Sequence, residues 1–199
     1  VFVLSLIFTL LCVLFCLNGT NLIDGQHGLA LGSVAIILFN LKISGSTDTQ
    51  YLYLINILLI ITLIIFCFNF FFGNIRIGDT GSYYLGFMTA FIALYANKLD
   101  YFEPFQVACI VFYPTFEVIF SYIRRIVFKK NPFKPDDLHL HSLIFKILNK
   151  RKFNNEKFFE FNNRITSLLI IFFQMLIWTF IYNFGSNISF SSLQISVSP

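Results

Sequence analysis

Residues 51–72 read YLYLINILLIITLIIFCFNFFF, an apolar run without a charged side chain. A helix needs roughly 20 apolar residues to cross the hydrocarbon core of a bilayer, so this run predicts a transmembrane helix. The whole chain suits a membrane, because 57% of its 199 residues are hydrophobic and only 12% are charged. A soluble domain of this size needs far more surface charge. The sequence therefore predicts an all-α integral membrane protein.

Further apolar segments flank this run. Three of them are long enough to span a bilayer, and two shorter ones cover only about 22 Å each as straight helices. The shorter segments would span only with their polar ends in the headgroup region or inside a bundle. The expected single membrane domain has six transmembrane helices, near residues 1–17, 29–43, 51–72, 83–97, 105–123 and 165–184.

Basic residues orient these spans. Of the 14 Lys and Arg residues, 11 lie within residues 124–164, and the 44–50 connection carries none. Because cytoplasmic loops are enriched in Lys and Arg, the 124–164 loop is expected in the cytoplasm. Counting back two spans at a time places residues 73–82 and 18–28 on the same side. Three polar stretches are thus expected to share the cytoplasmic face.

The first stretch, residues 18–28, reads NGTNLIDGQHG. Asn18, Asn21 and Asp24 recur every three residues, so a helix end would point two amides and a carboxylate into one cleft. His27 lies one helical turn after Asp24. The alternative is an ordinary turn between buried helices, in which Asn and Asp side chains cap the backbone.

The second stretch, residues 73–86, reads GNIRIGDTGSYYLG and places Asp79 between Gly78 and Gly81. Glycines let a backbone approach a phosphate or a hydrated ion closely, and Mg²⁺ prefers carboxylate oxygen ligands. The alternative is a helix N-cap. A cap does not need a glycine on each side, which favours the functional interpretation.

The third stretch, residues 131–145, reads NPFKPDDLHLHSLIF. Side chains at His139 and His141 point the same way only in an extended segment, which indicates a ligand loop rather than a helix. Imidazoles bind metals or hydrogen-bond phosphate, although a solvated loop with incidental histidines is the alternative. Nearby, Glu117 is an intramembrane carboxylate with structural and functional roles both open. Arg124 would anchor a span end or contact a phosphate.

Taken together, these stretches resemble the motifs of the polyprenyl-phosphate N-acetylhexosamine-1-phosphate transferases. This is glycosyltransferase family 4, which includes relatives of the phospho-MurNAc-pentapeptide translocase. The family motif N-x-x-N-x-x-D-G-x-D/N-G-L-A stands here as NGTNLIDGQHGLA at 18–30, and G-D-x-G-S-x-x-L-G as GDTGSYYLG at 78–86. The motif P-F-x-P-D-x-x-H-x-H-H stands as PFKPDDLHLHS at 132–142, and PTFE at 114–117 resembles P-x-x-D.

This resemblance implies transfer of N-acetylhexosamine 1-phosphate from a UDP-sugar such as UDP-GlcNAc to a polyprenyl (undecaprenyl) phosphate, with release of UMP. Such a step initiates lipid-linked glycans of the cell wall or of the O-antigen of lipopolysaccharide. The implied setting is the bacterial inner membrane, with Mg²⁺ as cofactor and Mn²⁺ as its alternative. A homodimer is a further expectation, and nucleic acid is not an expected partner.

The resemblance also assigns roles. Asp79 would ligate Mg²⁺ on the donor diphosphate, and Asp24 would be the second catalytic residue. The substrate-binding residues would be Asn18, Asn21, His27, His139, His141 and Arg124. His27 stands where the family has Asp or Asn, and Ser142 replaces the last His of the third motif.

The family has ten or eleven spans and an Asp-Asp motif on an earlier loop, whereas the only Asp-Asp here is Asp136-Asp137 in the third motif. The chain is therefore expected to be a fragment, roughly the C-terminal half, and inactive alone. The alternatives are a membrane transporter, with Glu117 along its path, and a non-catalytic assembly subunit. A transporter has no need for three loops of Gly, Asp and His on one face.

Overall fold

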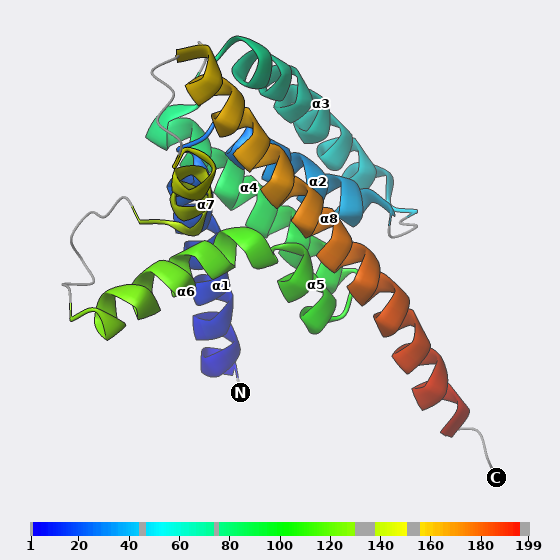
Figure 1. Cartoon of the computed structure of the whole chain (residues 1–199). Coiled ribbons are helices and arrows are strands. Elements are labelled where there is room, and N and C mark those ends of the chain that lie inside the picture. The colour runs from blue at the N-terminus through cyan, green and yellow to red at the C-terminus, as the bar shows by residue number, and fades with distance from the viewer. Residues whose placement is uncertain (1, 44–46, 74–75, 130–137, 151–155, 196–199) are drawn as a thin grey trace.

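The computed structural model describes residues 2–43, 47–73, 76–129, 138–150 and 156–195. This part of the chain is all-helical, which confirms the predicted fold class (Figure 1). Its helices are α1 (Phe2–Ile23), α2 (Leu29–Ile43), α3 (Thr49–Phe72), α4 (Gly78–Lys98), α5 (Pro104–Ile110), α6 (Phe112–Val127), α7 (Leu140–Leu148) and α8 (Glu156–Ile195).

Two described helices are long and apolar enough to cross a membrane: α3, and Lys157–Phe180 of α8. They contain most of the predicted spans 51–72 and 165–184. The bent pair α5 and α6 makes a third span if it is counted as one. By length and composition the structure thus supports two or three spans. The other predicted spans are helical, but Thr9–Ile23 and α2 are shorter apolar helices, and α4 does not qualify.

The predicted span 105–123 is not one straight helix. It breaks at Val111, where α5 ends and α6 begins at an angle of 75°. Pro114 explains the break, because proline has no amide hydrogen to donate to the carbonyl of Ile110 and its ring crowds the preceding turn. Proline is well tolerated in the first turn of the new helix instead. The break turns α6 across the end of the bundle.

Helix α1 continues beyond the predicted boundary at residue 17, to Ile23. Two glycines let α1 pack closely against α4 and α6. A Cβ at Gly19 would lie 2.1 Å from the carbonyl oxygen of Pro114 on α6, and one at Gly86 on α4 would lie 2.9 Å from the Cα of Leu17. Backbones that approach so closely leave no room for a methyl group. The first polar stretch is therefore held against both α4 and α6.

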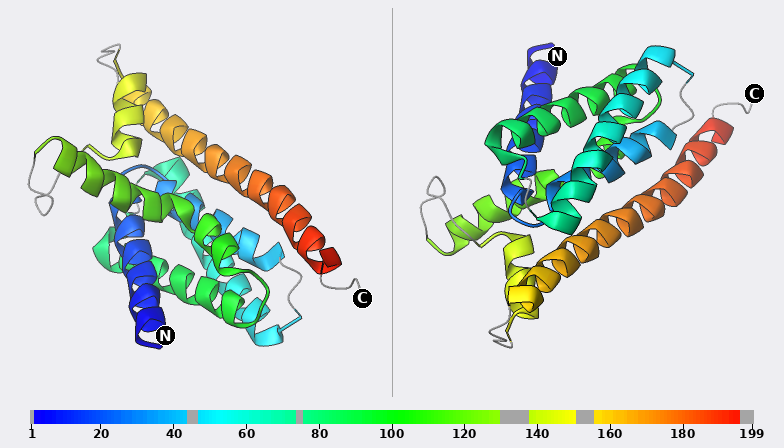
Figure 2. Two further views of the ribbon diagram at one scale, coloured as in Figure 1. Left: turned by 90° about the horizontal axis from the view of Figure 1, so that it is seen from below. Right: turned by 90° about the horizontal axis from the view of Figure 1, so that it is seen from above.

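Helix α2 forms the centre of the bundle, and twelve of its fifteen residues are buried. The two views of Figure 2 show the long helix α8 along one edge of the other helices. Trp178 of α8 packs edge-on against Phe102, with ring centroids 6.0 Å apart. Nearer the start of α8, Arg164 donates a hydrogen bond to the carbonyl of Phe71, which places this part of the helix beside the end of α3.

Candidate active site

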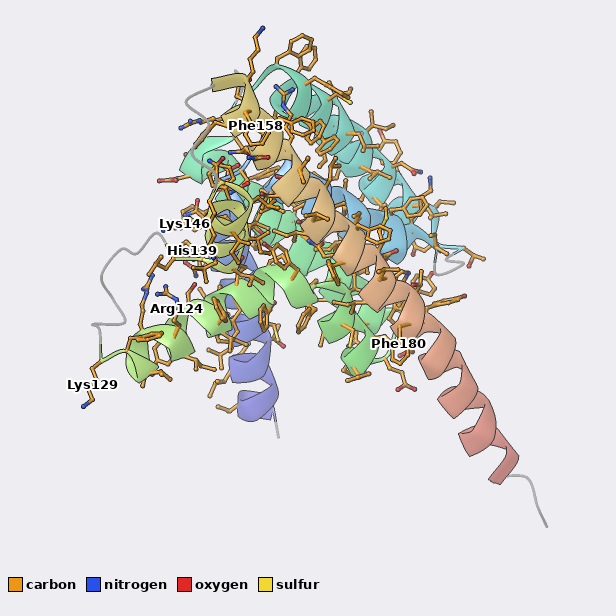
Figure 3. All side chains as sticks on the ribbon, viewed as in Figure 1. Arg124, Lys129, His139, Lys146, Phe158 and Phe180 are labelled. Carbon is orange, nitrogen blue, oxygen red and sulfur yellow. The ribbon has the colours of Figure 1, made fainter. Side chains whose placement is uncertain are left out.

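The polar stretches meet at one end of the bundle, around a pocket of about 430 Å³. It is lined by Asp24, Gly25, Gln26, His27, Asn69, Arg76, Ser142, Phe145, Lys146, Phe159 and Asn163. Each of the three stretches singled out in the sequence contributes to this lining. Figure 3 labels His139 and Lys146 toward this end of the molecule, with Phe158 at the start of α8. The described parts of the three stretches thus meet at one end of the bundle, and their place on the cytoplasmic face stays a prediction.

The turn between α1 and α2 is held by two asparagines from outside the motifs. The amide of His27 donates to the side-chain oxygen of Asn163 at 2.8 Å, and the amide of Gly28 donates to that of Asn69. Gly28 has φ +76°, a conformation that glycine adopts without strain. Helices α3 and α8 thus fix the backbone that presents Asp24 to the pocket.

Asp24 has an unusual electrostatic environment. Burial raises the pKa of its carboxyl to about 6 from an ordinary value of 3.8, and the charge of Asp79 acts in the same direction. Arg76 and a hydrogen bond from the backbone amide of Gly78 oppose this rise in pKa. The first and second motifs are therefore close enough to couple their charges. Perturbed carboxyl groups in a cleft are typical of functional sites.

The raised pKa makes the charge on Asp24 costly. Since its folded-state pKa exceeds the unfolded value, stability falls as pH rises from about 4 through 6. We expect Asp24→Asn to raise the free energy of unfolding by about 1 kcal/mol at pH 7.5, allowing for solvent screening of the half-buried group. The gain should shrink at pH 4.5. Thermal unfolding in detergent at both pH values checks this, and lower stability at pH 7.5 would contradict it.

Asn21 links the first two motifs directly. Its side-chain oxygen accepts a hydrogen bond from Ser82 at 2.6 Å, and its amide donates to the hydroxyl of Tyr83 at 3.3 Å. Asn18 is not part of this network, because it is exposed and donates to the carbonyl of Leu14 in its own helix. Of the three predicted cleft residues, Asp24 lines the pocket, Asn21 joins α1 to α4, and Asn18 does neither.

Asp79 is exposed in the first turn of α4 and does not line the pocket. Within the described ranges, no three His, Cys, Asp or Glu side chains group as a metal site. Mg²⁺, however, is commonly held by one or two carboxylates together with water and substrate phosphates. Asp79, with the charge of Asp24 nearby, fits such a partial ligand set. The Mg²⁺ site stays a prediction.

The two histidines of the third motif lie side by side. Their rings stack with centroids 5.5 Å apart and planes at 7°. His139 is extended and caps α7, but His141 already belongs to that helix, so the predicted loop is only partly a loop. His139 Nδ1 hydrogen-bonds the hydroxyl of Ser121 at 2.9 Å. The preceding residues 132–137 of this motif, with Asp136-Asp137, lie outside the described residues.

Glu117 anchors this histidine segment. Its fully buried carboxylate accepts from the Tyr113 hydroxyl at 2.9 Å and from the amides of Leu140 and His141 at 3.1 and 3.2 Å. It also contacts His141 Nδ1 at 3.1 Å. A carboxylate at a helix N-terminus satisfies amides that have no partner within the helix. Glu117 on α6 therefore docks the start of α7.

The other two predicted imidazoles, of His139 and His27, both have a lowered pKa. Burial lowers the pKa of His139, and the neighbouring charges of Arg124 and Arg125 contribute to the same effect. Burial also lowers the pKa of His27, with a further contribution from Arg164. Neutral imidazoles offer one donor and one acceptor each. Arg124 is buried on α6 and is not among the residues that line the pocket. Its predicted phosphate contact therefore stays a prediction.

Sequence reasoning missed several residues of this site, among them Arg76, Lys146, Asn69 and Asn163. The two cations resemble other basic residues near a predicted cytoplasmic surface. The two asparagines lie in helices with no motif around them, and only their distance to the turn reveals their role. A search for cations next to the motif glycines would have found Arg76 alone.

Comparison with known proteins gives a family match for part of the chain. Residues 1–97 match the family described as glycosyl transferase family 4. The chain is 30% identical over 138 residues to the undecaprenyl-phosphate alpha-N-acetylglucosaminyl 1-phosphate transferase of Thermotoga maritima, covering 68% of this chain and 41% of that protein.

Two further relatives have similar names. The chain is 33% identical over 137 residues to the probable undecaprenyl-phosphate N-acetylglucosaminyl 1-phosphate transferase of Bacillus subtilis, covering 67% of this chain and 38% of that protein. It is 28% identical over 166 residues to the decaprenyl-phosphate N-acetylglucosaminephosphotransferase of Mycobacterium leprae, covering 72% of this chain and 42% of that protein. The chain thus spans less than half the length of these relatives. No solved structure matches it.

Proposed function

Since residues 1–97 of this chain match the family described as glycosyl transferase family 4, we propose that the protein transfers a sugar 1-phosphate to a polyprenyl phosphate. The donor is a UDP-N-acetylhexosamine, and the products are UMP and a polyprenyl-diphosphate-linked sugar. One structural observation carries the proposal: the three motif stretches meet, at the end of apolar helices, at a pocket lined by Asp24, Arg76 and Lys146.

The proposed chemistry is one phosphoryl transfer. An oxygen of the lipid phosphate attacks the phosphorus attached to the sugar, and the bond from that phosphorus to the oxygen bridging to UMP breaks. UMP leaves with the bridging oxygen and the electron pair of the broken bond. Mg²⁺, held by Asp79, would relieve the charge of the donor diphosphate. Arg76 and Lys146 line the pocket and supply further positive charge.

Asp24 is suited to proton handling in this step. Its pKa of about 6 is close to the second pKa of a phosphate monoester, which is also about 6. Proton transfer between groups of matched pKa needs little driving force. Asp24 can therefore take the proton of a singly protonated lipid phosphate, which leaves a better nucleophile.

The lipid acceptor suits a site at a membrane surface. Of the chain's 14 Lys and Arg residues, 11 lie within residues 124–164, and Lys146 of this group lines the pocket, so we place the pocket at the cytoplasmic face of the bacterial inner membrane. The alternative of a transporter rests on Glu117 as a path-lining carboxylate. That residue instead accepts hydrogen bonds from its neighbours and is fully buried.

The decisive experiment measures UMP release from the product of the complete gene. Purified protein in detergent would be given undecaprenyl phosphate, Mg²⁺ and a panel of UDP-sugars. Release of UMP with one UDP-N-acetylhexosamine, only when the lipid phosphate is present, is the expected result. Absence of UMP with every donor, in protein that is stably folded, would overturn the proposal and favour the assembly-subunit alternative.

His139 should act mainly on the donor. Its neutral ring lies next to His141 and is held by Ser121, so we expect His139→Ala to raise the KM for the UDP-sugar about tenfold, a loss of about 1.4 kcal/mol. The KM for the lipid should stay unchanged. His139→Asn, whose amide can replace the bond to Ser121, should recover part of the loss. Unchanged donor kinetics in the Ala variant would remove His139 from the donor site.

A further inference from the structure

The mechanism above does not use Glu117, although its environment is unusual for a structural residue. It is a fully buried carboxylate with four hydrogen-bonding contacts, of which three go to the segment Leu140–His141. An isolated buried charge is costly, so a carboxylate persists there only with such compensation. Capping α7 would need only the two backbone contacts. The third contact, to the ring of His141, requires its own explanation.

The contact to the ring fixes which nitrogen carries the proton. An ionised carboxylate only accepts hydrogen bonds, so the Nδ1 of His141, 3.1 Å from Glu117 Oε1, must be the donor. In the neutral imidazole, Nε2 is then left as the acceptor. The carboxylate–histidine contact therefore sets both the orientation and the tautomer of the ring.

The far side of the same ring faces the first motif. A Cβ built on Gly25 would lie 3.2 Å from His141 Nε2, closer than most Cβ contacts. Gly25 follows Asp24 and lines the pocket, as does Ser142, the residue after His141. The imidazole thus lies between Glu117 on α6 and the Asp24–Gly25 turn.

We propose that Glu117 is a positioning residue for the proposed transfer: it holds His141 as the tautomer protonated on Nδ1, so that Nε2 is presented as an acceptor beside the Asp24–Gly25 turn. The inference rests on the proposed function for its kinetic consequence. Glu117 touches no substrate and acts only through His141. Gly25 supports the same arrangement from the other side by leaving room for the ring.

A double-mutant cycle tests this coupling. We expect Glu117→Gln to lower kcat about 100-fold with little change in the KM for the UDP-sugar, because an amide at this position can donate to Nδ1 and stabilise the other tautomer. Glu117→Asp, which keeps the carboxylate, should recover part of the loss. In a His141→Ala background, Glu117→Gln should lower kcat by less than about a further twofold. Equal losses of kcat in the two backgrounds would overturn the inference.

Tyr113→Phe is the matched control. It removes another hydrogen bond to Glu117 but leaves the contact with His141, so kcat should fall less than about threefold. A loss as large as that of Glu117→Gln would indicate a merely structural carboxylate and contradict the proposal. Thermal unfolding of each variant in detergent identifies a variant that fails to fold. If Glu117→Gln fails to fold, the kcat of Glu117→Asp is compared with that of Tyr113→Phe instead.

A second measurement does not depend on turnover. In protein labelled with ¹⁵N-histidine, with His27, His139 and every histidine outside residues 1–199 replaced by Gln, the remaining ring signal reports the tautomer of His141. The wild-type residue at 117 should give the form protonated on Nδ1, and Glu117→Gln should shift it toward the form protonated on Nε2. The Nε2–H form in the presence of Glu117 would overturn the inference. If the complete protein releases no UMP, the proposed function fails, while the ring signal still decides the role of Glu117.

Discussion

Gly19→Ala should strongly destabilise the folded protein, although it adds a single methyl group. The added Cβ would lie 2.1 Å from the carbonyl oxygen of Pro114 and 2.4 Å from its carbonyl carbon. Both atoms belong to the backbone, so no side-chain rotation relieves the clash. Helices α1 and α6 would have to separate, which loses packing on both sides of the contact.

The expected loss is large for so small a change. Overpacking a tight contact costs roughly 1–3 kcal/mol, and here the cost should lie at or above the upper end because neither backbone can yield. For a chain of this size we expect a fall of about 10 °C in the unfolding midpoint in detergent. UMP release should fall as well, because α6 carries Glu117 and so places the histidine segment.

Leu14→Ala is the matched control for Gly19→Ala. Leu14 lies on the same helix about one turn earlier and is 53% exposed on the outside of the bundle. Its truncation should shift the unfolding midpoint by no more than about 2 °C. If Gly19→Ala proved as stable as the control, the close approach of α1 to Pro114 would be wrong, and the site geometry derived from it would fail too.

The sequence predicted those parts of the fold that depend on local pattern. The span at 51–72 was evident because its apolar run has bilayer length, and the turn at Asp24–Gly28 was evident from its glycines. The break at Val111 was harder to predict from the sequence. Pro114 was visible, but prolines bend helices by different amounts, and the 75° angle depends on packing between α6 and α1.

The candidate site was predictable only where motifs mark it. Asp24, Asp79 and the two histidines lie in recognisable patterns, whereas Asn163 acts across 136 positions of sequence on the amide of His27. No local rule distinguishes it from the adjacent Asn162. Glu117 was suspected as an intramembrane carboxylate, but its partners lie 23 and 24 residues later, in a helix whose docking only the structure reveals.

Asp79→Asn should abolish Mg²⁺-dependent UMP release by the complete protein, with a loss of at least about a thousandfold. The substitution removes one negative charge and leaves the shape of the side chain nearly unchanged. An amide oxygen is a far weaker ligand for Mg²⁺ than a carboxylate. Electrostatic stabilisation of a phosphoryl transfer is among the largest contributions to its rate, so losing the ion's anchor should affect kcat most.

Position 79 makes this a clean experiment, because the side chain is exposed in the first turn of α4 and supports no buried packing. Membrane insertion and the unfolding midpoint should therefore stay at wild-type values. Asp100→Asn is the matched control: it makes the same change at an exposed position beyond the other end of α4, where φ is +57°, a conformation that Asn also tolerates.

A titration with Mg²⁺ separates ion binding from other roles of Asp79. If Asp79 holds the ion, Asp79→Glu should keep measurable turnover but need a higher Mg²⁺ concentration for half-maximal rate, because the longer side chain misplaces the carboxylate. Loss of the Asp79 charge should also lower the pKa of Asp24, since the two charges are coupled. Wild-type turnover in Asp79→Asn would exclude Asp79 from the site. The second motif would then serve only to dock α4 against Asn21 through Ser82.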